Sequence, residues 1–381
     1  MDFQFTSESV TSAHPDKLCD QISDSVLDEL LRQDPDSRAA VETTACTDFV
    51  HVMGEVTSKA QIDMESIVRD TIRHAGYTKD EYGFTDRVRV VTSVHNQSPD
   101  IARGVDSCQE LGAGDQGIMF GYATNECRNA LPLTLNLARS LTGALTEARR
   151  SGLISWLRPD GKAQVTVDYH NGKARRIATV VLSAQHDEDV DIGQLRRELK
   201  QKVILPNLPA GLVDENTVFL INPTGRFVLG GPAADTGLTG RKIIVDTYGG
   251  WAPHGGGAFS GKDATKVDRS ASYAARNIAK TIVESRIADR VLVQLAYAIG
   301  VARPVGIFVD TFSTSLVDDS RLASWIQGAW DLSPKGIISE FRLDQPQYAQ
   351  LSETGHFGGN QAWEAVSEDR IRELKRLVWK K

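Results

Sequence analysis

The first hundred residues alternate between helical and strand-like patterns. Apolar residues recur at helical spacing from position 15 to 32, and Pro15 suits the first turn of a helix. Two β-branched runs at 38–47 and 49–56, separated by a short polar break, predict a hairpin. A second helix is expected between Asp63, which suits its N-cap, and Gly76, which suits its C-cap, before a strand at 87–94.

The rest of the chain keeps alternating without the regular order of a parallel sheet. A leucine repeat starting at Leu133 predicts a long helix, and strand-like runs at 163–170 and 173–184 flank Asn171-Gly172, which suits a type I′ turn. A helix from 267 to about 286, strands at 291–299 and 305–311, and short amphipathic helices complete the pattern. The expected fold class is therefore α+β, with three similar domains that each pack helices on one face of a β-sheet.

We expect these three domains to occupy residues 1–100, 111–228 and 229–381, with chain segments allowed to interleave between them. Residues 95–117 lack periodicity, are rich in glycine and polar residues, and suit a mobile loop or lid. Residues 222–266 form a second glycine-rich segment with one clear strand at 242–246. This segment is too long for a plain connector.

Composition narrows the class of protein. With 381 residues, 41% of them hydrophobic, the chain is long enough for two or three globular domains. The net charge of −7 argues against a protein that coats nucleic acid or an anionic membrane. The four cysteines have neither Cys-x-x-Cys nor zinc spacing. The amino terminus does not resemble a signal peptide, and no run of 18 apolar residues suggests a membrane span. We expect a cytoplasmic protein.

One turn at the start of the first predicted helix contains a histidine, an acid and a lysine. A helix N-terminus favours anions, so His14 and Lys17 suit a bound phosphate, and Asp16 suits a magnesium ion. A helix cap with solvated charges is the alternative. The spacing alone does not decide between them.

Three glycines surround Asp115 in the segment 112–117. Glycine lets the backbone approach a ligand closely, and Asp115 is then placed to contact a polar group or a cation. A tight turn that leads into a strand explains the same residues equally well.

The segment 230–268 mixes glycines with fixed cations and aromatic residues. Close wrapping of a polyphosphate requires this combination, because arginine and lysine supply charge while backbone amides supply donors. A flexible linker is the alternative, although linkers rarely contain interspersed cations and aromatics. Residues 256–262 fit the start of a P-loop, but Asp263 replaces the required Ser or Thr and the preceding strand ends too early. A P-loop NTPase is therefore rejected.

Taken together, these segments closely resemble the S-adenosylmethionine synthetase family. The matching stretches cover nearly the whole chain and are FTSESV and HPDK near the start, QSPDI from Gln97, GAGDQGIMFGYATNE from Gly112, NPTGRFVLGGPAADTGLTGRKIIVDTYGG from Asn222, HGGGAFSGKD from His254 and KVDRSASYAARNIAK from Lys266. Such long matches are far more specific than any short motif.

The resemblance implies a role for each matching residue. ATP would be bound by His14, Asp160, Lys162, Arg226, Phe227, Asp235, Arg241, Lys242, Ala258, Lys262 and Lys266. Methionine would be bound by Glu55, Gln97, Asp235 and Lys266. The residues expected to act in catalysis are His14, Asp115, Lys162, Arg241, Lys242, Lys262 and Lys266.

The resemblance also implies cofactors and partners. Two Mg²⁺ ions per site would be held through Asp16 and Asp268, and K⁺ through Glu42. The substrates would be ATP and L-methionine, in a homodimer with shared active sites or a dimer of such dimers, without nucleic acid or membrane. The implied reaction is attack of the methionine sulfur on C5′ of ATP, followed by cleavage of the triphosphate to diphosphate and phosphate.

Two other function classes use the same residue types. A kinase or other phosphoryl-transfer enzyme would use the cations to move a phosphate to an acceptor and would release ADP. A non-catalytic nucleotide-binding paralogue would bind without turnover. Every cation and acid that the synthetase chemistry needs is present in the sequence, which argues against the paralogue.

Overall fold

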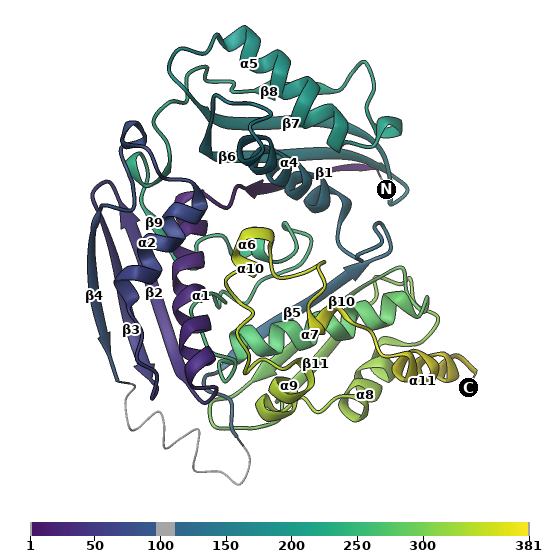
Figure 1. The fold of residues 1–381 in the computed structure, drawn as a ribbon. Helices are drawn as coiled ribbons and strands as arrows, with labels where there is room; N and C mark the ends of the chain where they lie inside the picture. The colour runs from purple at the N-terminus through teal and green to yellow at the C-terminus, as the bar shows by residue number, and fades with distance from the viewer. Residues whose placement is uncertain (1, 97–110, 380–381) are drawn as a thin grey trace.

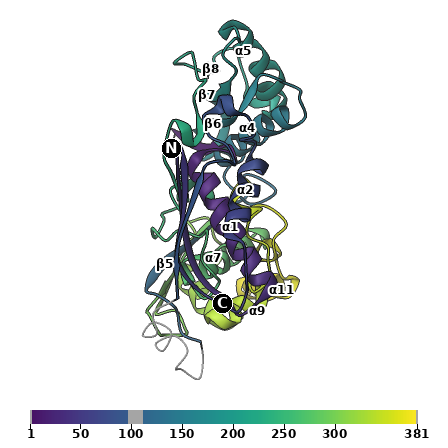
Figure 2. The same ribbon diagram turned by 60° about the vertical axis from the view of Figure 1, so that its left-hand side comes forward.

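The protein folds into three β-sheets with their helices on one side, as expected for an α+β chain of three similar units. The computed structural model describes residues 2–96 and 111–379 (Figure 1). Turned to its edge, the molecule shows the strands on one side and most helices on the other (Figure 2). One face of the sheets is therefore covered by helices and the opposite face is uncovered.

The first sheet, called here the β2 sheet, has strand order β4-β3-β2-β9. Its strands are β2 (Arg38–Cys46), β3 (Phe49–Thr57), β4 (Arg89–His95) and the two-residue β9 (Gly237–Leu238). β2 and β3 form the predicted antiparallel hairpin, and β4 joins β3 in parallel. The helices are α1 (Pro15–Gln33) and α2 (Met64–Ala75), and the side chain of Asp63 caps α2 as predicted.

The second sheet, the β6 sheet, has strand order β1-β6-β7-β8. Its strands are β1 (Phe3–Val10), β6 (Leu157–His170), β7 (Lys173–His186) and β8 (Val218–Ile221). Asn171 and Gly172 both have positive φ between β6 and β7, which confirms the predicted hairpin turn. α4 (Leu133–Arg150) packs on β6 and β1, and α5 (Ile192–Glu198) continues as a π-helical segment to Ile204.

The third sheet, the β10 sheet, has strand order β11-β10-β5. Its strands are β5 (Gly117–Thr124), β10 (Arg290–Tyr297) and β11 (Gly306–Asp310). α7 (Val267–Glu284) packs against β5 and β10. The remaining helices are α6 (Ile243–Asp246), α8 (Asp319–Ala329), α9 (Pro334–Phe341), α10 (Leu351–Thr354) and α11 (Glu368–Trp379).

Each of the three sheets is built from two separate parts of the chain. β1 pairs with β6, β5 pairs with β10, and β9 pairs with β2, so each sheet contains a strand from a distant part of the sequence. The boundaries at residues 100, 111 and 228 remain a prediction, since strand pairing does not follow the chain order. Within residues 2–96 and 111–379, none of the helices has the length and apolar character needed to cross a membrane.

The predicted strand at 242–246 is wrong, because residues Ile243–Asp246 form the single helical turn α6. The β-branched run Ile243, Ile244, Val245 suggested a strand, but this segment has no strand neighbour. The guanidinium of Arg139 instead donates to the carbonyl oxygen of Val245 at 2.8 Å and to that of Asp246 at 3.3 Å. These tertiary bonds satisfy carbonyls that a short helix leaves free.

Candidate active site

Helix α1 carries a row of four buried aspartates at spacing four, Asp16, Asp20, Asp24 and Asp28, which places them on one helix face. Like charges at this spacing repel unless partners compensate them. The carboxylates accept from backbone N–H groups of three downstream segments: Asp16 and Asp20 from Leu238 and Gly240, Asp24 from Gly261, and Asp28 from residues 347–349. The aspartate row therefore fixes these loops of the chain along one helix.

His14 lies at the N-cap of α1 and is only 2% exposed. Its Nδ1 accepts from the backbone N–H of Asp16 at 3.2 Å, which assigns the ring proton to Nε2. Burial lowers the pKa of His14 to about 3, helped by the nearby ammonium groups of Lys242 and Lys162. At neutral pH His14 is therefore an uncharged donor.

Asp16 accepts from the N–H of Leu238 at 3.0 Å and forms an ion pair with Lys242. The Nε of Arg241 lies 3.8 Å from its carboxylate. Although burial on its own raises the pKa of Asp16, the bonds from Lys242 and Leu238 hold it below its usual value. Asp16 is thus ionised and holds two cations at the start of α1.

Asp160 and Lys162 reach the same place from β6. Lys162 pairs with Val10 in the β-ladder, at the end of the strand that leads into His14. Asp160 is buried, and one of its carboxylate oxygens accepts from the N–H of Gly231 at 2.9 Å. Its other oxygen, Oδ1, has no hydrogen-bond partner among the described residues. Burial raises the pKa of Asp160 to about 6, with Asp235 adding to the rise.

These residues define the first group of candidate site residues: His14, Asp16, Asp160, Lys162, Asp235, Arg241 and Lys242. The structure brings together residues of α1, of β6 and of the segment after β9, which interact through ion pairs and other electrostatic contacts. Asp235 and Arg241 are exposed, whereas His14, Asp16 and Asp160 are buried. The buried acceptor of Asp160 suits a hydrogen-bond donor of a ligand, and the cations suit an anionic part of the same ligand.

Phe227 lies beside this group, but Arg226 turns away. The backbone of Phe227 is held by His186, whose Nε2 accepts from the Phe227 N–H at 3.0 Å. A Cβ at Gly230 would lie 2.9 Å from the Phe227 ring, so the ring packs directly on the glycine backbone. Arg226 is exposed and pairs with Glu188.

A second group consists of Asp115, Ala258, Lys262, Lys266 and Asp268. Lys262 Nζ lies 2.7 Å from the Asp268 carboxylate, and Lys266 pairs with Asp263. A Cβ at Gly257 would lie 2.1 Å from the Asp268 carboxylate, which explains the glycine there. Asp115 is exposed and accepts from the N–H of Gln116 at 2.7 Å.

The two groups lie beside different parts of α1. The first is tied to Asp16 and the second to Asp24, through Gly261. Eight helical residues separate these aspartates, or about 12 Å at about 1.5 Å per residue. The two segments touch at Gly240, where a Cβ would lie 2.4 Å from the Cβ of Ala258. Within one chain the two groups are neighbours but do not merge into one cluster.

Glu42 and Glu55 lie on the uncovered face of the β2 sheet. Glu42 is opposite Met53, Glu55 is opposite Ala40, and the alternation along β2 and β3 places both glutamates on the same face. Glu55 Oε1 lies 3.9 Å from Nε2 of His95. Gln97 and most of the predicted lid fall outside the described residues.

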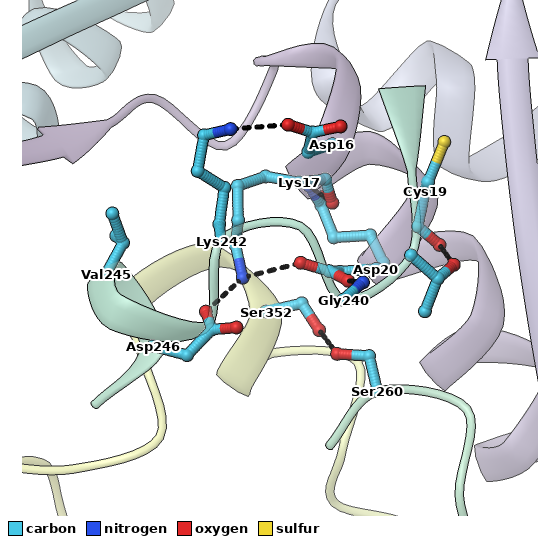
Figure 3. Close-up of polar contacts among 12 residues, drawn as sticks. Asp16, Lys17, Cys19, Asp20, Gly240, Lys242, Val245, Asp246, Ser260 and Ser352 are labelled. Carbon is cyan, nitrogen blue, oxygen red and sulfur yellow. Dashed lines mark hydrogen bonds and ion pairs between the residues drawn. The ribbon is translucent and has the colours of Figure 1, made fainter. Parts of the chain in front are cut away.

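The prediction that Lys17 meets a phosphate is wrong. Lys17 is 3% exposed, and its Nζ lies 3.0 Å from Asp20 and 2.6 Å from Asp246 (Figure 3). Burial on its own would lower the pKa of Lys17, but these two carboxylates raise it above its usual value. The alternative of solvated charges at this helix start is also wrong, because His14, Asp16 and Lys17 are all buried.

Several residues that shape the site were not identified from the sequence. Asp20, Asp24, Asp246 and Asp263 each bind a backbone N–H group, a cation or both within the loops of the two groups. For the first two, a signal was present, because aspartate recurs every four residues along a predicted helix that also carries a regular set of apolar residues. Such a row on an exposed face would be unfavourable, so it indicates buried partners.

No set of three His, Cys, Asp or Glu side chains in the described part of the chain is arranged to hold a metal ion. Asp16 and Asp268 instead each pair with one lysine, Lys242 and Lys262 respectively. Magnesium in phosphate sites commonly takes only one or two carboxylates and completes its shell with phosphate oxygens and water. The donors present fit that mode of binding.

Comparison with known proteins identifies the same family in every part of the chain. Three family models match, described as the N-terminal, central and C-terminal domains of S-adenosylmethionine synthetase, at residues 2–99, 110–227 and 229–365. The chain is 53% identical to the S-adenosylmethionine synthase of Pseudothermotoga lettingae, over 98% of each chain. It is 51% identical to that of Clostridium tetani, over 98% of this chain and 99% of that protein, and 53% identical to that of Desulforudis audaxviator, over 97% of each.

Proposed function

The chain belongs to the S-adenosylmethionine synthetase family and forms S-adenosylmethionine from L-methionine and ATP, and we propose that the first and second groups together form its active site. The methionine sulfur attacks C5′ of ATP, and the triphosphate is then cleaved to diphosphate and phosphate. The observation that supports this placement best is that Lys162 lies near both His14 and Asp160, with Lys242 also near His14, while Oδ1 of Asp160 has no hydrogen-bond partner among the described residues.

The residue types suit this reaction. A thioether carries no proton, so its attack on carbon needs no general base. Negative charge develops on the departing triphosphate, and the enzyme must place the sulfur in line and stabilise that charge. Lys162, Arg241 and Lys242 of the first group supply positive charge, and uncharged His14 donates from Nε2. Each preorganised donor of this kind contributes about 2.7–4 kcal/mol to the lowering of the barrier.

We assign Asp160 to the nucleotide as well. Its free Oδ1 is buried, and a hydroxyl or amino donor of the bound nucleotide would give it the partner that the described protein residues do not provide. Phe227 packs beside it and offers an aromatic surface, while Arg226 remains an ATP contact only if it leaves Glu188. Ala258 would line the site next to Gly240.

The enzyme uses metal ions, and we propose two Mg²⁺ ions and one K⁺ per site. Asp16 and Asp268 would hold the magnesium ions, which supply charge neutralisation on the triphosphate. Glu42 would hold potassium at the uncovered face of the β2 sheet. We propose that Glu55, Gln97, Asp235 and Lys266 bind methionine, and that Asp115 lies near both substrates.

We propose that two copies of the chain share their active sites, and that two such dimers could associate further. Within one chain the first and second groups are about 12 Å apart along α1, and the lysines of the second group are paired with their own acids. The uncovered face also carries large apolar side chains, among them Phe308 at 52% and Ile118 at 44% exposure. Exposed apolar patches of this kind favour association.

We also place the enzyme in the cytoplasm, without nucleic acid or membrane as a partner. In the described residues Cys19, Cys46 and Cys127 are free thiols, which suits a reducing compartment.

The reaction is tested by incubating the protein with ATP, L-methionine, magnesium and potassium, and separating the products by chromatography. S-adenosylmethionine, diphosphate and phosphate should appear in equal amounts and only with methionine. Release of ADP alone would contradict the assignment in favour of phosphoryl transfer.

The shared site is tested by mixing two inactive variants, Lys242→Ala from the first group and Lys262→Ala from the second. If each site takes its two groups from different chains, every mixed dimer has one site with both changes and one site with none. Random exchange makes about half of the dimers mixed, so activity should return to about a quarter of the wild-type value. No recovery after demonstrated subunit exchange would show that each site lies within one chain.

A further inference from the structure

Lys17, Asp20 and Asp246 form a buried network that joins α1 to the segment between β9 and the end of α6. Lys17 Nζ lies 3.0 Å from Asp20 Oδ2 and 2.6 Å from Asp246 Oδ1, as Figure 3 shows. The other oxygen of Asp20 accepts from the N–H of Gly240 at 2.8 Å. The network therefore holds both ends of residues 240–246.

The segment held in this way carries Arg241 and Lys242. Lys242 pairs with Asp16, and Arg241 lies 3.8 Å from the same carboxylate. Both cations are thus placed against the start of α1 by contacts at either end of their own segment. A shift of this segment along α1 would move both of them relative to His14.

A second contact holds α6 through another helix, α4. The Nη2 of Arg139 on α4 donates to the carbonyl of Val245 at 2.8 Å, and its Nη1 donates to that of Phe357 at 2.9 Å. α6 is consequently bound both by Lys17 on α1 and by Arg139 on α4. The Lys17 contacts set the position of residues 240–246 relative to α1, because they join that helix to both ends of the segment.

Stability alone does not account for this network. Replacing a buried set of charges by apolar side chains of similar volume is often neutral or stabilising, because desolvation of the charges offsets their attraction. An ion pair fixes the direction and distance between its two groups, which an apolar contact does not. Such directional contacts are useful where a catalytic group must be placed to within a fraction of an ångström.

We propose that Lys17, acting through Asp20 and Asp246, is a positioning residue that sets Arg241 and Lys242 against His14 and Asp16 for the triphosphate. The inference rests on the proposed assignment of Lys242 and His14 to ATP. Lys17 itself touches no substrate, because its ammonium group is buried and occupied by the two carboxylates.

The first test is Lys17→Met, which keeps the length of the side chain and removes its charge. Turnover should fall at least about tenfold and KM for ATP should rise, while KM for methionine stays within about twofold. Arg150→Ala is the matched control. Arg150 lines the same cavity as Lys17, and in the described part of the chain its side chain binds Glu353 and His74, so both KM values and turnover should stay within about twofold of wild type.

The second test uses a cavity of about 420 Å³ that Lys17 and Asp246 line together with α4. In Lys17→Ala, added ethylammonium ions can enter this cavity and occupy the place of the lost ammonium group. They should restore turnover at least about fivefold in Lys17→Ala, and should leave wild type and Arg150→Ala unchanged. Propionate at the same concentration, which has the wrong charge, should restore nothing.

Unchanged turnover and KM for ATP in folded Lys17→Met would overturn the proposal, as would equal rises of KM for both substrates. If Lys17→Met does not fold, Asp246→Asn, which keeps the shape of the carboxylate, is measured in the same way. A rise of KM for ATP without a rise of KM for methionine would then support the positioning role, and equal rises would overturn it. Lys242→Ala separates this inference from the proposed function. Full activity in Lys242→Ala would contradict the assignment of ATP contacts, whereas loss in Lys242→Ala with none in Lys17→Met would contradict only the positioning role.

Discussion

Asp160→Asn should make the ligand-free protein more stable at high pH. The carboxylate of Asp160 is buried, and burial raises its pKa to about 6 from an ordinary value of 3.8. The folded state therefore holds the proton more tightly than the unfolded chain does. As pH rises from about 4 through about 6, the folded state must bury the charged form, and the free energy of unfolding falls.

The size of the effect follows from this difference in pKa. About two pKa units at about 1.36 kcal/mol each give about 3 kcal/mol at pH 8 and about half of that at pH 5. Unfolding entropy of about 2.1 cal/mol/K per residue over 381 residues converts about 3 kcal/mol into a rise in Tm of about 4 °C. Asparagine can still accept from Gly231 through its amide oxygen, and its uncharged NH₂ group takes the place of Oδ1, as the OH group does in the protonated acid.

The assay is calorimetry of both proteins without ligands at pH 5 and pH 8. The Tm gain of Asp160→Asn should be about 2 °C at pH 5 and about 4 °C at pH 8. Asp168→Asn is the control on the same strand, because Asp168 is partly exposed and pairs with Arg176 at 2.7 Å, and it should show no gain at either pH. A gain that does not grow with pH, or a loss at pH 8, would refute the reasoning. With ATP and magnesium present, wild type should be stabilised more than Asp160→Asn, because the variant lacks the proposed acceptor.

Two further changes test the proposed contacts. Lys262→Ala should fold normally, because the ammonium group of Lys262 is partly exposed and forms an ion pair with Asp268. Turnover should fall at least about a hundredfold through loss of one transition-state contact. Near-normal steady-state turnover would contradict the proposed role of Lys262. Glu55→Gln removes a charge from the uncovered face of the β2 sheet and should raise KM for methionine more than KM for ATP, and equal rises in the two constants would exclude Glu55 as a methionine contact.

The local pattern of the sequence was sufficient to predict most of the fold. α1, α2, α4, α7 and the two hairpins follow from spacing, caps and the Asn171-Gly172 turn, and the structure places each within a few residues of its expected position. In these elements local propensity and tertiary contacts favour the same conformation. The run at 243–245 shows the opposite case, where β-branched residues form a helical turn because Arg139 and Lys17 bind its end.

Other features depend on contacts between distant residues and could not be predicted. The pairing of β1 with β6 and of β5 with β10 depends on which strand edges the folded chain brings together. Periodicity along one strand contains no information on its partner. The same holds for Lys17, since a lysine next to a helix start suits a phosphate equally well until Asp246, far away in the sequence, is known to bind it.

Two pairs in the candidate site suggest how its charges are kept in place before substrates bind. Lys242 pairs with Asp16, and Lys262 pairs with Asp268, so these two proposed phosphate contacts are each bound to a proposed metal ligand. An unpaired lysine or aspartate in these partly buried positions would be costly. Asp16 and Asp268 would hold the proposed magnesium ions, and Lys242 and Lys262 would then be available to the triphosphate. These four charges therefore have partners in the ligand-free protein, which stabilises them beside the proposed triphosphate site.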